Sequence, residues 1–289
     1  MTILDMATEE ISPMALRQDF KRSFTIAIWG SAGAGKSLIA ANLAFEFASF
    51  GAKTLLVDLD QRRPSLAALL ALVDAGPGIT AVTRLGRQGR LTASELVRLS
   101  ADLRFGKHQL DVLPGLSSPL RWTELDGPGL DALLETASKD FDIIVFDLND
   151  EIEPGLVSSG SQNDRNFATR WAISNSQSTL GLFSADPVGI NRFLDLAKTC
   201  DFDFLPIANR VNSSTLGRHP ERQIRDAIYR ATKISPHSFL PWDPGASDSV
   251  LASAKPLLLQ KNSSKLANAL HALALELFDT RPTALNSRM

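Results

Sequence analysis

The sequence Gly30-Ser-Ala-Gly-Ala-Gly-Lys-Ser37 decides how this chain is expected to fold. It matches the pattern G-x-x-x-x-G-K-[ST], in which glycines allow successive backbone N–H groups to surround a phosphate. The apolar run Phe24–Trp29 predicts a strand before it, and the periodicity of residues 38–50 predicts a helix after it that stops at Gly51. A loop between a strand and a helix favours phosphate binding over the alternative, a glycine-rich turn with a solvated lysine.

Each position of this loop has an expected part in binding a nucleoside triphosphate, most simply ATP or ADP, together with Mg²⁺. Lys36 is expected to reach the β- and γ-phosphates and to take part in catalysis, and the Ser37 hydroxyl is expected to ligate magnesium. The residues whose backbone is expected to surround the phosphates are Gly30, Ser31, Ala32, Gly33, Ala34 and Gly35.

Apolar stretches of strand length alternate with helix-like segments along the rest of the chain. Strands are predicted at residues 54–57, 110–113, 143–146, 179–183, 204–208 and 238–240. Helices are predicted within 65–100, with a break at 76–78, and at 130–138, 164–174, 188–199, 222–232 and 263–278. Continuously apolar strands, each followed by a helix, indicate a doubly wound α/β fold with a mostly parallel sheet and helices on both faces.

The expected organisation is a single domain at residues 23–278, with a flexible polar leader at 1–22 and a polar tail at 279–289. Residues 148–163 are polar and acidic and are predicted to form a mobile loop. The formal net charge of -2 gives no overall basic field for nucleic acid or anionic membrane. A single cysteine, Cys200, excludes an intramolecular disulfide. Without a secretory signal or a membrane-spanning stretch, we expect a soluble cytoplasmic protein.

Three aspartates follow predicted strands, at the carboxyl ends where parallel sheets bind ligands. Asp147 ends the run 143–146 and is expected to hold magnesium through a water, although aspartates at strand ends are also common turn formers. Asp58 and Asp60 lie on one side of the strand end at 54–57 because they occupy alternate positions. One is expected to orient the attacking water and the other to support magnesium; the alternative is that both cap the following helix.

Six segments together resemble the ParA/MinD group of P-loop ATPases, and most closely its MinD-like, CpaE/TadZ-like proteins of actinobacteria. The similarity covers about residues 23–278 and implies the MinD-like fold of P-loop NTPases. It further implies an ATPase that dimerises face to face across two nucleotides and positions cellular machinery. The segments are WGSAGAGKS (29–37), AANLAFEFASFGAKTLLVDLD (40–60), FDIIVFD (141–147), ADPVGINR (185–192), NRV (209–211) and LPWDPGASDSVLASAKPLL (240–258).

The resemblance assigns roles to residues that their own sequence context does not. Asn209, which alone would be interpreted as a turn residue, is implied to recognise adenine through its amide, in a pair with Arg210. The turn Pro241–Asp243 is implied to line the base pocket. Asp60 is implied to act on the hydrolytic water, with Asp58 beside the metal.

Two features depart from the pattern of the group. The group carries a second lysine near the start of the loop, which reaches the partner's phosphates, and Ser31 occupies that position here. After Asp147, two acidic residues, Asp150 and Glu151, replace the usual proline- and glycine-containing switch and are unfavourable close to a γ-phosphate. ATP binding with slow hydrolysis is therefore expected, and a scaffold with little or no hydrolysis is the alternative.

The expected partners are a second copy of the chain, bound in a nucleotide-dependent manner, and a protein of a pilus, secretion or cell-division apparatus. The cluster Arg84, Arg87 and Arg90 is interpreted as a solvated face, so DNA partitioning is the less favoured alternative. A tyrosine-kinase relative is disfavoured because Tyr229 is the only tyrosine. The tail at 279–289 has too few apolar side chains for a membrane anchor, so recruitment to a pole or membrane would depend on partners.

Overall fold

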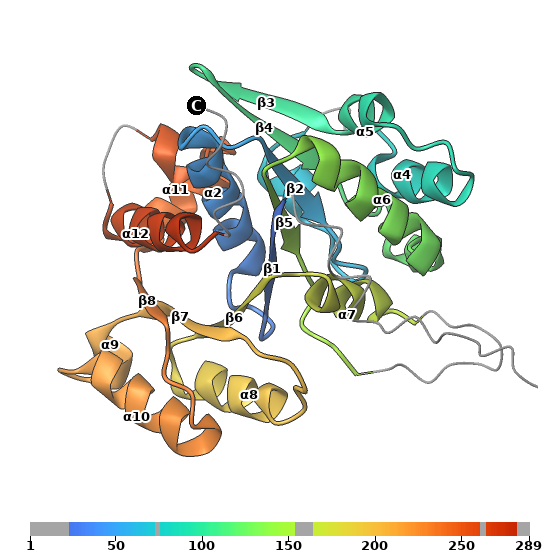
Figure 1. Ribbon diagram of the computed structural model, residues 1–289. Coiled ribbons are helices and arrows are strands. Elements are labelled where there is room, and N and C mark those ends of the chain that lie inside the picture. Colours follow the sequence, from blue (N-terminus) through green and yellow to red (C-terminus); the bar gives the residue numbers. More distant parts are fainter. Residues whose placement is uncertain (1–22, 73–75, 154–163, 261–263, 282–289) are drawn as a thin grey trace, which may run out of the picture.

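The computed structural model of the protein describes residues 23–72, 76–153, 164–260 and 264–281. In this part of the chain eight strands form one sheet, in the order β3-β4-β2-β5-β1-β6-β7-β8 (Figure 1). All neighbouring strands are parallel except β3, which is antiparallel to β4. Their bounds are β1 Phe24–Gly30, β2 Thr54–Asp58, β3 Ala101–Phe105, β4 His108–Leu113, β5 Ile143–Asp147, β6 Ser178–Ser184, β7 Leu205–Val211 and β8 Ser238–Pro241.

Helices cover both faces of this sheet, which confirms the predicted doubly wound α/β fold. The helices α2, α11 and α12 pack on one face, and α4 to α8 with α10 pack on the other (Figure 1). Their bounds are α2 Lys36–Ser49, α3 Leu66–Leu69, α4 Gly78–Arg87, α5 Ala93–Leu99, α6 Gly127–Asp140, α7 Phe167–Ser174, α8 Pro187–Ala197, α9 Ser213–Leu216, α10 Pro220–Thr232, α11 Pro244–Ser253 and α12 Lys265–Asp279, with 3-10 turns η1 Pro119–Glu124 and η2 Leu257–Leu259.

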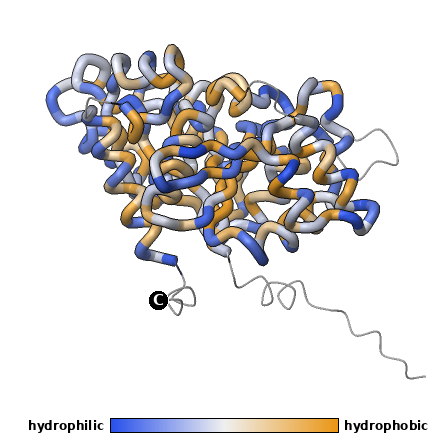
Figure 2. Tube along the Cα trace, turned by 90° about the horizontal axis from the view of Figure 1, so that it is seen from above, coloured by the Kyte–Doolittle hydropathy of each residue, from blue (hydrophilic) through white to orange (hydrophobic). Residues whose placement is uncertain are grey.

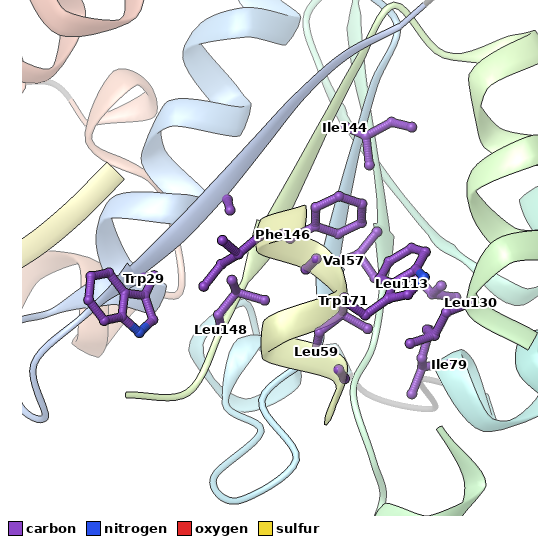
Figure 3. Packing of buried hydrophobic residues seen from close by; sticks show 14 of the residues in the cluster. Trp29, Val57, Leu59, Ile79, Leu113, Leu130, Ile144, Phe146, Leu148 and Trp171 are labelled. Carbon is purple, nitrogen blue, oxygen red and sulfur yellow. The ribbon is translucent and has the colours of Figure 1, made fainter. Parts of the chain in front are cut away.

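The central strands are buried on both sides because their residues alternate between two hydrophobic clusters. In β1, Ile26 and Ile28 belong to the cluster beneath α2, whereas Ala27 and Trp29 belong to the opposite cluster. Figure 3 shows this second cluster, with Phe146 of β5 and Trp171 of α7 among its large members. In the view of Figure 2 the hydrophobic segments concentrate inside the molecule and the hydrophilic ones lie mainly at its periphery. A rigid, doubly covered sheet thus supports the loops at its carboxyl edge.

The sequence did not predict five elements, which are strand β3, helices α9 and α11, and the 3-10 turns η1 and η2. Strand β3 is a half-exposed edge strand, in which Asp102 and Arg104 face solvent, so it lacks the continuous apolar run that marks the other strands. Helix α11 begins at Pro244 directly after Asp243, whose side chain accepts the backbone N–H of Ala246 at 3.1 Å. An aspartate followed by proline is a helix-start signal, so α11 was detectable.

Some predicted segments lie outside the described residues. They are the leader at 1–22, most of the tail at 279–289 and residues 154–163 of the predicted loop. Residues 148–153 form neither helix nor strand, as predicted. Among the described residues, every helix is too short or too polar to cross a membrane.

Candidate functional site

The loop between β1 and α2 has the backbone conformation that its glycines were expected to provide. Gly33 and Gly35 have left-handed φ angles of 74° and 86°. At its start, the backbone N–H of Ser31 donates to the carbonyl of Leu182 in β6 at 2.9 Å. A Cβ at Gly30 would lie 2.0 Å from that same carbonyl oxygen, so only glycine allows this close approach. The loop is therefore fixed to the neighbouring strand before any ligand binds.

The charged and hydroxyl groups of the loop lie at the start of α2. The ammonium of Lys36 is 3.5 Å from the carbonyl oxygen of Ser31, and the Ser37 hydroxyl is 2.8 Å from the hydroxyl of Ser65. The Ser31 hydroxyl is buried and has no hydrogen-bond partner among the described residues. Backbone N–H groups and the positive end of the α2 dipole make this loop suited to an anion.

Asp58 and Asp147 lie side by side at the ends of β2 and β5, as register partners. Both are buried, with 1% of each residue exposed. Neither carboxylate oxygen of Asp147 has a hydrogen-bond partner in the described part of the chain. Burial, followed by the charge of Asp58, raises the pKa of Asp147 well above its ordinary value, against the opposing effect of Ser37 and Lys36.

Asp58 is held in place by backbone N–H groups. Its carboxylate accepts from Ser65 at 2.9 Å and Leu66 at 3.0 Å, at the start of α3, and from Asp60 at 3.1 Å. Burial raises the pKa of Asp58 to about 7, and the backbone hydrogen bond from Leu66 is the largest effect that opposes it. These bonds are the ones that the helix-capping interpretation requires, and they also hold the carboxylate beside Asp147.

Asp60 lies at the start of the loop after β2. Its carboxylate accepts the backbone N–H groups of Arg62 and Arg63, each at 2.8 Å, so it closes a turn before α3 and does not cap that helix. Its side chain is only partly buried. A role on the hydrolytic water therefore stays a prediction for Asp60.

The surroundings of Asp147 fit a hydrated magnesium ion. Two buried carboxylates of raised pKa, beside the serine hydroxyl of a phosphate loop, would be relieved by a divalent cation. The described residues contain no group of three His, Cys, Asp or Glu side chains able to hold a metal without other ligands. Mg²⁺ takes few protein ligands and completes its shell with phosphate oxygens and water. Ser37 and Asp147 would hold it, with Asp58 beside them.

The residues implied to contact the base meet at the end of β7 and β8. Arg210 has a left-handed φ of 61°, and its guanidinium lies 5.5 Å from the ring centre of Trp242. Pro241 is the last residue of β8, and Asp243 caps α11. Asn209 is buried, and its amide contacts the phosphate loop, with Nδ2 donating to the carbonyl of Ala34 at 2.8 Å. Adenine recognition by these residues stays a prediction.

Trp242, inside the turn Pro241–Asp243 that the resemblance assigns to the base pocket, is 43% exposed beside Arg210. Sequence reasoning missed a polar network around Arg62. The guanidinium of Arg62 pairs with Glu151 at 2.5 Å and donates to Asn166 at 3.1 Å. No local pattern marks this network, because its members are separated by about a hundred positions. It neutralises one of the two acidic residues that we expected to face the γ-phosphate.

Comparisons with known proteins agree with this geometry. Residues 26–256 match the family described as the CobQ/CobB/MinD/ParA nucleotide binding domain. The ParA family ATPase from Chlorobium tepidum TLS has a similar structure, with a TM-score of 0.68 and 18% identity, covering 88% of this chain and 98% of that chain. The septum site-determining protein MinD from Pyrococcus horikoshii OT3, complexed with Mg-ADP, gives a TM-score of 0.65 and 19% identity, covering 92% and 99%.

A chain of the MinC:MinD cell division protein complex from Aquifex aeolicus gives a TM-score of 0.62 and 18% identity, covering 89% of this chain and 96% of that chain. Among curated protein sequences, none matches this chain. At these identities the structural likeness establishes the fold, and the family match establishes the kind of domain.

Proposed function

The chain belongs to the CobQ/CobB/MinD/ParA nucleotide-binding domain family, and on that basis we propose that it binds ATP with magnesium and hydrolyses it slowly. The observation that carries the proposal is the position of Asp147. Its buried carboxylate has no hydrogen-bond partner among the described residues, and the residue pairs in register with Ile28, two residues before the phosphate loop begins. A phosphate loop beside a carboxylate that lacks a partner is the arrangement that a magnesium-bound nucleotide would complete.

We propose slow turnover for two reasons. Ser31 stands where the ParA/MinD group has a lysine, so no positive charge from that position is available for the developing charge on the phosphates. In Asp60, the residue assigned to the hydrolytic water, one carboxylate oxygen already accepts hydrogen bonds from two backbone N–H groups. Lys36 remains as the one charged residue of the loop itself.

The test measures MgATP affinity and turnover in the wild type, Lys36→Ala and Asp60→Ala. Lys36→Ala is expected to lower affinity about a hundredfold, because a charge-assisted contact to the phosphates is lost. Asp60→Ala is expected to bind MgATP nearly as well as the wild type but to hydrolyse it at least tenfold more slowly. Equal background turnover in all three proteins would reduce the chain to a nucleotide-binding scaffold.

We further propose that nucleotide binding gates a positioning or assembly role, in a pilus or secretion system or in septum or polar placement, as in CpaE/TadZ-like proteins. The support is the family and the resemblance, including similarity to MinD in a complex with MinC. Sedimentation with ADP and with a nonhydrolysable ATP analogue tests the expected homodimer. An unchanged mass would remove the nucleotide gate, and salt-insensitive capture of a secretion ATPase would support the role.

One observation favours DNA partitioning as the second candidate. Residues 210–233, which include α9 and α10, contain six Lys or Arg and two Asp or Glu, and all six cations are exposed. They are Arg210, Arg218, Arg222, Arg225, Arg230 and Lys233. Such a surface suits a phosphate backbone, and binding to DNA would then weaken steeply with salt. Duplex binding that is absent at low salt would eliminate this candidate.

A further inference from the structure

The side chain of Asn209 connects β7 to the phosphate loop. Asn209 pairs with Ser184 of β6 in the sheet and is only 6% exposed. Its Nδ2 donates to the backbone carbonyl of Ala34 at 2.8 Å, and its Oδ1 accepts the backbone N–H of Arg210 at 2.8 Å. One planar amide thus joins a strand end to a loop that is 175 residues away in the sequence.

The orientation of this amide is determined by its two neighbours. A backbone N–H can only donate, so the atom facing Arg210 must be the oxygen of Asn209. A backbone carbonyl can only accept, so the atom facing Ala34 must be the nitrogen. The N–H of Arg210 thus meets the side chain of the residue before it, and Arg210 itself has a left-handed φ of 61°. Neither bond survives a rotation of the amide, which therefore has one stable orientation.

Holding the carbonyl of Ala34 also fixes the next N–H group of the loop. In a trans peptide the C=O and N–H point to opposite sides, so the N–H of Gly35 is directed away from Asn209. Gly35 has a φ of 86°, and a Cβ there would lie 2.9 Å from Nδ2 of Asn209. The amide therefore packs tightly against the Ala34–Gly35 peptide and restricts its rotation.

We propose that Asn209 is a positioning residue for phosphate binding: by holding the Ala34 carbonyl, it keeps the Gly35 N–H directed into the loop for the nucleotide phosphates. This inference rests on the proposed ATP-binding function and goes beyond recognition of adenine. The two roles are compatible, because the second hydrogen on Nδ2 remains available for a base. They differ in their consequences for a ligand that has phosphates but no base.

The first experiment compares Asn209→Ala with Asn212→Ala in the full chain. Asn212 is a matched control, since its side chain caps α9 three residues further along and does not contact the loop. Affinities for MgATP and for magnesium tripolyphosphate are measured by displacement of a fluorescent ADP. Asn209→Ala is expected to lower the affinity for both ligands by the same factor, roughly fivefold to tenfold, which is the effect of losing one buried hydrogen bond. Asn212→Ala is expected to leave both affinities unchanged.

Asn209→Asp provides a second measurement that needs no ligand. It keeps the acceptor for the Arg210 N–H, and with it the turn after β7, but removes the donor to Ala34. Amide hydrogen exchange in the ligand-free protein is expected to accelerate at residues 34–36 by about tenfold, while exchange in the central strand β1 is unchanged. Far-UV circular dichroism confirms that the variant is folded.

The outcomes separate the possible roles. Loss of ATP affinity with unchanged tripolyphosphate affinity would overturn the positioning role and leave adenine recognition, as would unchanged exchange in Asn209→Asp. If tripolyphosphate displaces ADP from neither the wild type nor the variant, the exchange result decides. A wild-type protein that binds neither ATP nor ADP would overturn the proposed function itself, and this positioning role with it.

Discussion

The two sides of the candidate site are prepared for their ligands in opposite ways. On the phosphate side, the loop is held by hydrogen bonds to β6 and β7, through Leu182 and Asn209. On the metal side, Asp58 and Asp147 are buried next to each other, and Asp147 has no hydrogen-bond partner among the described residues. The phosphate loop is held in place without a ligand, whereas the two buried carboxylates on the metal side repel each other, and a cation would relieve that repulsion.

This difference indicates where ligand binding supplies free energy. A preformed loop loses little conformational entropy when a phosphate binds. A pair of buried carboxylates favours protonation until a cation neutralises it, so metal binding there is coupled to proton release. Substitutions that disturb the contacts of the phosphate loop are therefore expected to lower the stability of the fold. Substitutions of the buried carboxylates are expected to raise the stability of the ligand-free protein and to lower its affinity for the ligand.

The strongest test of the phosphate side is Gly30→Ala. A methyl group at this position would lie 2.0 Å from the Leu182 carbonyl oxygen, and the residue has a φ of 137°. We expect the free energy of unfolding to fall by about 4 kcal/mol or more, because the β1–β6 pair must separate. Gly33→Ala is the matched control: its φ is 74°, but no atom lies within 4 Å of the added Cβ.

Urea denaturation measures both variants. For Gly33→Ala the free energy of unfolding is expected to fall by only about 1 kcal/mol, which is the strain of an alanine in the left-handed conformation. If the two glycine variants were equally stable, the close approach of Gly30 to β6 would contribute nothing to the fold.

Asp147→Asn tests the metal side. An amide removes one of two adjacent buried charges, so the ligand-free protein at pH 8 is expected to gain about 1 kcal/mol of stability. MgATP affinity is expected to fall by about tenfold or more, since a neutral amide is a poorer partner for the metal. Thermal melts with and without MgATP measure both effects. If Asp147→Asn were less stable than the wild type without ligand, the proposed repulsion between the carboxylates of Asp58 and Asp147 would be wrong.

The sequence predicted the parts of this site that follow from local rules. A glycine-rich loop between an apolar strand and a helix specifies phosphate binding, and Asp58 and Asp147 follow from apolar strands that end in a carboxylate. It could not predict that Asp58 and Asp147 pair in register, because the sheet order β2-β5-β1 depends on long-range packing. The contact between Asn209 and Ala34 was inaccessible for the same reason. Edge strand β3 was missed because only one of its five residues is fully buried.

The pH dependence of stability distinguishes the metal side from an ordinary pair of carboxylates. Both Asp58, with a pKa raised to about 7, and Asp147 hold protons more tightly in the folded protein than in the unfolded chain. The folded state therefore binds more protons above about pH 4, and stability falls as the pH rises towards 7 and beyond.

We expect the free energy of unfolding of the ligand-free wild type to fall by about 2 to 3 kcal/mol between pH 5 and pH 8. The pH rises by about two units before it reaches the pKa of Asp58, and each unit corresponds to about 1.4 kcal/mol. Saturating MgADP should remove most of this loss. Urea titrations at several pH values measure it, and Asp147→Asn serves as a control with a flatter profile. Stability that rises over this range in the wild type and Asp147→Asn alike would show that other groups dominate.

The ion pair between Arg62 and Glu151 connects the loop after β2 with the segment after β5, and so lies on the metal side. The two charged groups are 2.5 Å apart, but the side chains are 26% and 49% exposed, so water screens their attraction. A double-mutant cycle with Arg62→Ala and Glu151→Ala is expected to give a coupling free energy of about 0.5 kcal/mol.

The additional bond from Arg62 to Asn166 predicts an asymmetry between the single variants. Arg62→Ala loses two contacts and should destabilise more than Glu151→Ala, which removes one carboxylate and leaves the guanidinium on Asn166. The same cycle measured on turnover tests whether the pair matters to chemistry. If Arg62 neutralises Glu151, Arg62→Ala alone should lower the affinity for MgATP, because the negative charge of Glu151 is then unpaired. Adding Glu151→Ala should restore that affinity.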